Sequence, residues 1–181
     1  MRSFNTIIFL SVFCCLIFYT TAEAQNGKKE LRLSPKAEVM QTVGFTDVRI
    51  SYSRPGVKKR TIWGKLVAYN SVWRAGADEA TKITFSTDVM IEGKQLKKGS
   101  YSFFAIPGKT EWTLIFNKVA DQWGAFEYNE SQDALRIKVK PEKAGWQEWL
   151  LYSITKTSNN TAVISLEWEK LKIPLKIEVK I

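Results

Sequence analysis

The chain has 181 residues, a net charge of +9 at neutral pH and a hydrophobic fraction of 45%. It contains no histidine, which excludes histidine-dependent catalytic triads, histidine zinc sites and imidazole switches near neutral pH. Both cysteines, Cys14 and Cys15, lie in an apolar N-terminal run, so the sequence after it holds no disulfide, zinc-thiolate site or cysteine nucleophile.

The N-terminus has the order of a secretory signal peptide. Arg2 precedes an apolar run over residues 7–19, and the small residues of Ala22-Glu23-Ala24 follow it. We expect cleavage after residue 24, export to the periplasm or the extracellular space, and no membrane span in the mature chain, because the run is shorter than the roughly 20 residues needed to cross a bilayer. An uncleaved anchor is the alternative. Residues 25–33 are predicted to form a flexible polar leader.

From residue 37 onward, short runs of β-branched and aromatic residues alternate with polar ones between turn residues. The expected strands cover residues 37–43, 47–53, 82–87, 89–91, 100–106, 112–117, 135–140, 148–155, 161–168 and 171–179. The pattern predicts an all-β domain over residues 34–181, a single antiparallel β-sandwich of about nine or ten strands. Pro174 cannot donate to a ladder, so the last strand is expected at a sheet edge.

Between residues 54 and 81 the alternation stops. A connection of about thirty residues is uncommon in a compact domain and is often functional. Its end, residues 73–81, places an arginine, two adjacent carboxylates and a hydroxyl among small residues. We interpret the loop as a candidate ligand-binding site. Its candidate residues are Arg54, Arg60, Trp63, Trp73, Arg74, Asp78, Glu79 and Thr81, together with Trp123 from a later loop.

The charged residues of this loop have two interpretations. Arg74 with Asp78 or Glu79 can be a structural ion pair that fastens the loop to the sandwich. Alternatively, Arg54 and Arg60 join the cluster and bind a carboxylate or phosphate in bidentate fashion. Asp78 and Glu79 are adjacent, and neighbouring side chains of an extended segment point to opposite faces, so they are not expected to form a facing catalytic pair.

The seven tryptophans also divide into two groups. Trp112 and Trp168 lie within strand patterns and are expected in the core. Trp63, Trp73 and Trp123 lie beside glycine or in polar loops, where an exposed ring can stack on a sugar face.

The positive charge is scattered along the chain. Arg136, Lys138 and Lys140, for example, alternate with apolar neighbours, as on the solvated face of a strand. This pattern argues against a nucleic-acid partner and favours a soluble surface or attraction to an anionic envelope polymer. The carboxylates are dispersed and form no calcium loop, so neither a metal nor a cofactor is expected.

Several ordered motifs are found together in this chain. They are Ser53-Arg54-Pro55, Arg60 through Ile62-Trp63-Gly64 to Leu66-Val67, Val72-Trp73-Arg74, Gly76-Ala77, Glu79-Ala80-Thr81, Glu92-Gly93-Lys94, Gly99-Ser100-Tyr101, Phe116-Asn117-Lys118 and Gln122-Trp123-Gly124. The series resembles the domain-of-unknown-function family 2911, which comprises secreted proteins mostly of Bacteroidetes. The resemblance implies export and an all-β domain, and it brings no established activity, cofactor or catalytic residue.

The chain departs from the pattern of that family at three positions. The family pattern has glycine at Lys59, proline at Ala68 and asparagine at Asp78. An asparagine at position 78 implies hydrogen bonding rather than proton abstraction. Glu79 is then the better candidate for an essential charge.

Three functions are compatible with the sequence. The leading hypothesis is an exported, non-catalytic β-sandwich that binds an envelope or extracellular ligand, for example a glycan, through the 54–81 loop with help from Trp123. The first alternative is a glycoside hydrolase with Glu79 as general acid or base and a second carboxylate from elsewhere, such as Asp121 or Glu127. The second alternative is a structural envelope protein. A binding site should open to solvent, whereas a structural cluster should be covered and internally paired.

Overall fold

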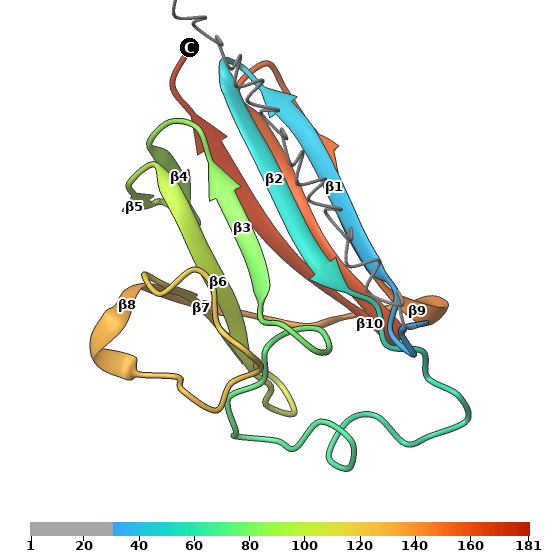
Figure 1. Ribbon diagram of the computed structural model, residues 1–181. Coiled ribbons are helices and arrows are strands. Elements are labelled where there is room, and N and C mark those ends of the chain that lie inside the picture. The colour runs from blue at the N-terminus through green and yellow to red at the C-terminus, as the bar shows by residue number, and fades with distance from the viewer. Residues whose placement is uncertain (1–30) are drawn as a thin grey trace, which may run out of the picture. The chain divides into compact units, whose positions relative to one another are not determined.

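The computed structural model describes residues 31–181 (Figure 1). The predicted signal peptide and most of the predicted leader lie outside the described residues. Within residues 31–181 no helix has the length and apolar character required to span a bilayer.

The described residues form ten strands in two antiparallel sheets, with one short 3-10 helix, η1 (Glu130–Gln132). The six-stranded sheet has the order β1 (Lys36–Val43), β2 (Thr46–Ser53), β3 (Thr81–Phe85), β6 (Gly99–Ile106), β7 (Trp112–Asn117) and β8 (Asp133–Val139). The four-stranded sheet has the order β5 (Lys94–Leu96), β4 (Val89–Ile91), β10 (Thr161–Val179) and β9 (Glu142–Lys156). The sheets pack around one apolar core, which confirms the predicted all-β sandwich.

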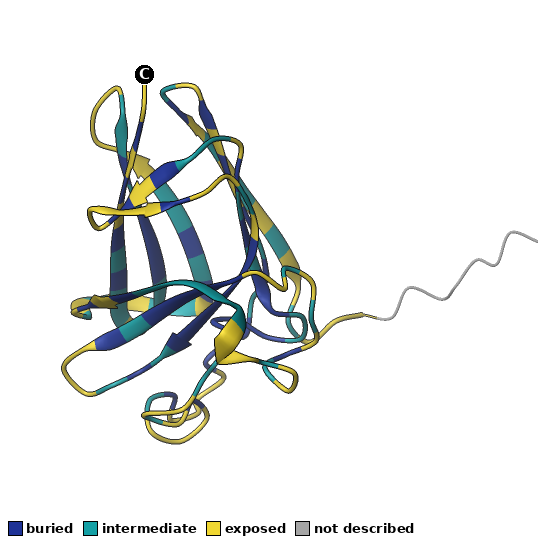
Figure 2. Cartoon of the chain, turned by 90° about the vertical axis from the view of Figure 1, so that its left-hand side faces the viewer, coloured by how far each residue is buried: buried dark blue, intermediate teal, exposed yellow. Residues whose placement is uncertain are grey.

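The core is built from alternate residues of the strands. In β2, Val48 and Ile50 are buried while Arg49 between them is exposed. This is the pattern of a strand with one face on an apolar core and the other in solvent, and Figure 2 shows it as buried segments along the strands. Trp112 and Trp168, both predicted core residues, are buried.

The predicted strands 161–168 and 171–179 form one continuous strand, β10. Its pairing with β9 shifts register on both sides of Glu169, which adopts a positive φ of 58°. Such a β-bulge interrupts the alternation of side chains without ending the ladder. The sequence pattern therefore predicts the end of a strand at the point where the structure has a β-bulge within one continuous strand.

β10 is not an edge strand, and the prediction made from Pro174 is wrong. β10 lies between β4 and β9. Its pairing with β9 ends at Lys172 and its pairing with β4 begins at Ile177, so Pro174 falls between the two ladders. The missing N–H consequently removes no ladder hydrogen bond.

The long loop between β2 and β3 is anchored to both sheets. Its start extends the four-stranded sheet, because Val57 N donates to Glu148 O (2.8 Å) and Leu150 N donates to the Pro55 carbonyl (3.0 Å). Its end joins the other sheet, where the backbones of Trp73 and Ala105 exchange two hydrogen bonds of 2.8 Å. The loop therefore lies at one end of the strands (Figure 1) and is held at two points.

Candidate functional site

The end of this loop, residues 73–81, is a turn held by the carbonyl of Ala75. That oxygen accepts hydrogen bonds from Thr81 Oγ1 (3.0 Å) and from Tyr152 Oη (2.8 Å). Gly76 fits because a Cβ there would lie 2.8 Å from Thr81 Oγ1 and 3.2 Å from a carbonyl oxygen of β2. Thr81 is fully buried, so this candidate residue holds the turn and does not face a ligand.

Two residues of the turn have left-handed backbone conformations. Ala75 has φ of 50° and Asp78 has φ of 56°. Aspartate and asparagine tolerate this region better than most other residues. The asparagine that the family resemblance implies at position 78 thus has a backbone explanation, which Asp78 also satisfies.

Asp78 and Glu79 line two different hollows of the surface. Asp78 lines the loop pocket, a hollow of about 380 Å³ whose polar residues include Ser34, Lys58, Arg60, Arg74 and Asp78. Glu79 lines the sheet cleft, a hollow of about 570 Å³ whose polar residues include Lys36, Glu38, Glu79, Lys82, Asp121 and Gln122. The two carboxylates therefore contact different spaces and do not form a facing pair.

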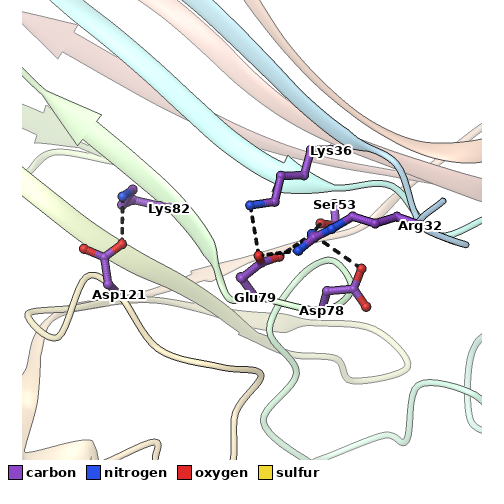
Figure 3. Close-up of polar contacts among 7 residues, drawn as sticks. All are labelled: Arg32, Lys36, Ser53, Asp78, Glu79, Lys82 and Asp121. Atoms are coloured by element: carbon purple, nitrogen blue, oxygen red, sulfur yellow. Dashed lines mark hydrogen bonds and ion pairs between the residues drawn. The ribbon is translucent and has the colours of Figure 1, made fainter. Parts of the chain in front are cut away.

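Glu79 is held by two cations (Figure 3). Both of its carboxylate oxygens accept hydrogen bonds of 2.7 Å from Arg32, and Lys36 Nζ lies 2.9 Å from Oε1. The hydrogen bonds from Arg32, followed by those from Lys36, hold the pKa of Glu79 well below its usual range, although partial burial opposes the shift. Glu79 consequently stays ionised at neutral pH and fastens the segment that precedes β1 to the end of the long loop.

The structure does not form the ion pair between Arg74 and either carboxylate that the sequence suggested. Asp78 instead lies 3.8 Å from Arg32, which binds mainly to Glu79. Arg32 belongs to the region predicted to be a flexible leader, so no local sequence pattern indicated it as the partner. Glu79 thus forms a structural ion pair, but with Arg32 in place of Arg74.

Arg74 has no carboxylate partner among residues 31–181. Its Nε is buried without a hydrogen-bond partner. The side chain lines the loop pocket, and its Nη1 would lie 3.3 Å from a Cβ at position 124, where the chain has glycine. Gly124 thus leaves room for the guanidinium.

The other two arginines of the loop bind backbone carbonyls. Arg54 Nε donates to Leu150 O (2.8 Å) and supports the contact of the loop with β9. Arg60 donates to Val57 O (3.1 Å) and to Gly56 O (2.6 Å), which closes the turn between them. Arg60 also lines the loop pocket, so its positive charge lies near that of Arg74.

Trp63 and Trp73 pack into an aromatic cluster with Trp112 and Trp168. The ring centroids of Trp63 and Trp112 are 4.9 Å apart, and Trp73 stacks on Trp168 at 5.9 Å. Trp73 Nε1 also donates to the carbonyl of Gly76 (3.1 Å). Both indoles therefore extend the core under the loop, and Trp73 additionally forms part of the loop pocket wall.

Trp123 is the most exposed of the three candidate tryptophans, with 57% of its surface accessible. Its backbone forms an isolated antiparallel bridge with Glu79, flanked by hydrogen bonds from Ala80 N to Gln122 O (3.0 Å) and from Gly124 N to Asp78 O (3.1 Å). The loop after β7 is therefore held against the Asp78-Glu79 segment. The indole itself lies largely in solvent.

The charges of the sheet cleft are paired with one another. Lys82 lies 2.7 Å from Asp121, Lys36 binds Glu79, and Glu38 pairs with Arg49 outside the cleft (Figure 3 for the first two). A charged ligand would have to break one of these pairs. Across residues 31–181, no group of three or more histidine, cysteine, aspartate or glutamate side chains is placed to hold a metal ion.

Sequence reasoning missed Arg32, Lys36 and Lys58 as residues of this region. Lys58 follows a Pro-Gly turn and enters the loop pocket because the turn of residues 57–60 folds back on itself. The double lysine beside an arginine at positions 58–60 is the signal that the sequence offers for a cationic turn.

The fold and this geometry define an all-β sandwich domain with a cationic pocket beneath a long, doubly anchored loop. Residues 34–177 match the model of the family described as "protein of unknown function (DUF2911)", and the chain belongs to that family. The resemblance seen in the sequence is thereby confirmed. No curated protein and no solved structure shows a significant match.

Proposed function

We propose that this protein is an exported, non-catalytic binding domain that holds an acidic group of an envelope or extracellular glycan in the loop pocket. The observation that carries the proposal is Arg74, a partly buried guanidinium that lines a pocket and has no counter-ion among the described residues.

The charge of the pocket supports an anionic ligand. Lys58, Arg60 and Arg74 line it, against the single carboxylate of Asp78, which also lies 3.8 Å from Arg32. A partly desolvated cation without a partner is unfavourable, and an incoming carboxylate offsets that cost. The planar guanidinium can donate two parallel hydrogen bonds to a carboxylate, which gives both energy and orientation.

The state of Glu79 supports a non-catalytic role. A glycosidase general acid needs a raised pKa, so that it is protonated when the leaving group departs. Glu79 has its pKa lowered by Arg32 and Lys36 and is engaged by both. Its geometry fits a structural ion pair, which is the part of the structural hypothesis that we retain.

The sheet cleft is larger than the loop pocket but provides a weaker argument for a ligand. Its lysines already bind carboxylates of the same cleft, so an anion gains no free partner there. A purely structural protein, in turn, does not explain why Arg74 has no counter-ion within residues 31–181.

The experiment compares two sugars that differ at one group. Tryptophan fluorescence is followed during titration with D-galacturonate or D-galactose, because Trp73 forms part of the pocket wall. We expect saturable binding of galacturonate and none of galactose, with a loss of at least about tenfold in affinity for Arg74→Gln. Lys82→Gln, which removes a cation from the sheet cleft, is the matched control and should bind as the wild type does.

Binding of both sugars with equal affinity, or unchanged galacturonate binding by Arg74→Gln, would overturn the proposal. Export is tested separately by the N-terminal sequence of the protein recovered from the periplasmic and external fractions. A mature chain that begins at Gln25 is expected, and recovery of the full chain from the cytoplasm alone would contradict export.

A further inference from the structure

A second hollow adjoins the loop pocket across the turn of residues 57–60. This tryptophan groove has a volume of about 360 Å³, and its lining includes Lys59, Arg60, Trp146 and Glu169. Arg60 lines both the groove and the loop pocket, so the two hollows share a wall. A ligand longer than one sugar can therefore contact both.

Trp146 is exposed at a place where the sheet is irregular. It has 55% of its surface accessible and lies in β9, where the pairing with β10 moves from Lys143↔Leu171 to Gln147↔Glu169. Residues of a β-bulge are re-aimed away from the regular pleat, and bulges are over-represented beside functional sites. The neighbouring Gly145 has open space at its Cβ position.

Two lysines of the shared turn have unfavourable backbone conformations. Lys58 has φ of 48° and Lys59 has φ of 59°, a region that residues with a Cβ seldom adopt. Strain of this kind persists where the surrounding structure enforces it, and it concentrates at functional sites.

The charges around the turn leave both lysine side chains available to an anion. Lys58 Nζ lies 5.6 Å from the centroid of the Trp149 ring. Neither Lys58 nor Lys59 forms an ion pair among residues 31–181. Two carboxylates of this region accept hydrogen bonds from backbone amides: Glu148 accepts from Lys58 N (2.8 Å), and Glu169, which lines the groove, accepts from Lys170 N (2.7 Å).

We propose that the ligand is a linear acidic polysaccharide of the polyuronate class, which runs from the loop pocket across the lysine turn into the tryptophan groove. This inference rests on the proposed function and names its ligand class. One uronate carboxylate binds Arg74, a second binds Lys58 or Lys59, and a sugar ring stacks on Trp146. An aromatic ring matches the apolar face of a sugar, while the cations match its carboxylates. Alternating charge and ring contacts select a charged sugar chain over a neutral one.

The test compares chain lengths by calorimetric titration of the full mature protein. The probes are D-galacturonate, its α-1,4-linked tetramer, the methyl-esterified tetramer and inorganic polyphosphate of similar charge. We expect the tetramer to bind at least about tenfold more tightly than the monomer, because linked subsites act together. The methyl ester should bind at least tenfold more weakly than the free tetramer.

Variants separate this inference from the proposed function. Trp146→Ala should reduce the affinity for the tetramer to that for the monomer and leave the monomer unchanged, whereas Arg74→Gln should weaken both. Phe45→Ala removes an exposed aromatic side chain from the turn between β1 and β2, at the opposite end of β2 from the long loop, and is the matched control. Thermal unfolding of each variant checks that it is folded.

Unchanged tetramer binding by Trp146→Ala would overturn the inference, and so would polyphosphate that binds as tightly as the tetramer, since the surface would then recognise charge alone. In either case, monomer binding that still requires Arg74 leaves the proposed function intact. If the wild-type protein does not bind the galacturonate monomer, both the inference and the proposed function are rejected.

Discussion

Glu79 and Arg74 belong to the same turn, yet their charges are satisfied in opposite ways. Glu79 is bound by Arg32 and Lys36, whereas Arg74 has no carboxylate partner among residues 31–181 and has a buried Nε without an acceptor. The sequence alone predicts that the two act as one cluster. They instead face different surroundings and have different physical tasks.

The difference shows how one segment can stabilise the fold and bind a ligand. Glu79 stabilises the fold, because its ion pairs with Arg32 and Lys36 fasten the segment before β1 to the end of the long loop. Arg74 lines a pocket whose other walls include the start of the loop, the segment before β1 and Trp168 of β10. If this division is correct, changes on the two sides should have separate effects on stability and on binding.

The largest effect is expected from Gly76→Ala, because this substitution disturbs the turn that carries both Arg74 and Glu79. In Gly76→Ala, the new Cβ would lie 2.8 Å from Thr81 Oγ1 and 3.2 Å from the Ser53 carbonyl. We expect the free energy of unfolding to fall by about 2 kcal/mol, since overpacking forces the backbone to shift. Urea unfolding measures this, and galacturonate binding should weaken as well. A stable variant with normal binding would mean that the turn does not set the geometry.

Glu79→Gln should have an intermediate effect, on stability alone. The ion pairs of Glu79 are partly exposed, so solvent screening limits the expected loss to about 1 kcal/mol or less at neutral pH. The pKa of Glu79 is lowered in the folded state, so its contribution is present above the unfolded pKa and is lost as pH falls through the folded pKa.

The difference in stability between wild type and Glu79→Gln should therefore be constant from about pH 8 to pH 6 and shrink as the pH drops below about 4, where the unfolded carboxyl takes up a proton. Urea unfolding at pH 7, 4 and 3 measures it. A difference that grows toward low pH would contradict the assigned ion pairs.

The smallest effect is expected from Arg74→Gln on the stability of the free protein. No hydrogen bond or ion pair with the described residues is lost, so the free energy of unfolding should stay within about 0.5 kcal/mol of the wild type. A loss greater than that of Glu79→Gln would show that Arg74 has a structural task and would erase the contrast between the two residues.

The sequence supported the fold better than the site, for a physical reason. Strands such as β2 and β3 have a local signal, the alternation of side chains between a buried and a more exposed face. The irregularity at Glu169 was misinterpreted as the end of a strand, because a bulge breaks the alternation without breaking the ladder. Pro174 was misinterpreted because its position between two ladders depends on strand order.

The partners within the site depend on contacts between distant segments. Arg32 and Glu79 are 47 positions apart in sequence, and nothing in the sequence around either residue identifies the other as its partner. The tryptophans of the loop could not be sorted either, because Trp63 and Trp73 become covered only when Trp112 and Trp168 pack against them. Residue types indicated the correct region, while the pairing of charges required the three-dimensional structure.

The central claim is that Arg74, and not Glu79, binds the acidic ligand. Calorimetric titration of D-galacturonate into wild type, Arg74→Gln and Glu79→Gln at neutral pH tests it most directly, with thermal unfolding as a check on folding. We predict that Glu79→Gln binds within about twofold of the wild type and that Arg74→Gln loses at least about tenfold in affinity. Retained binding by Arg74→Gln together with lost binding by a folded Glu79→Gln would contradict the claim.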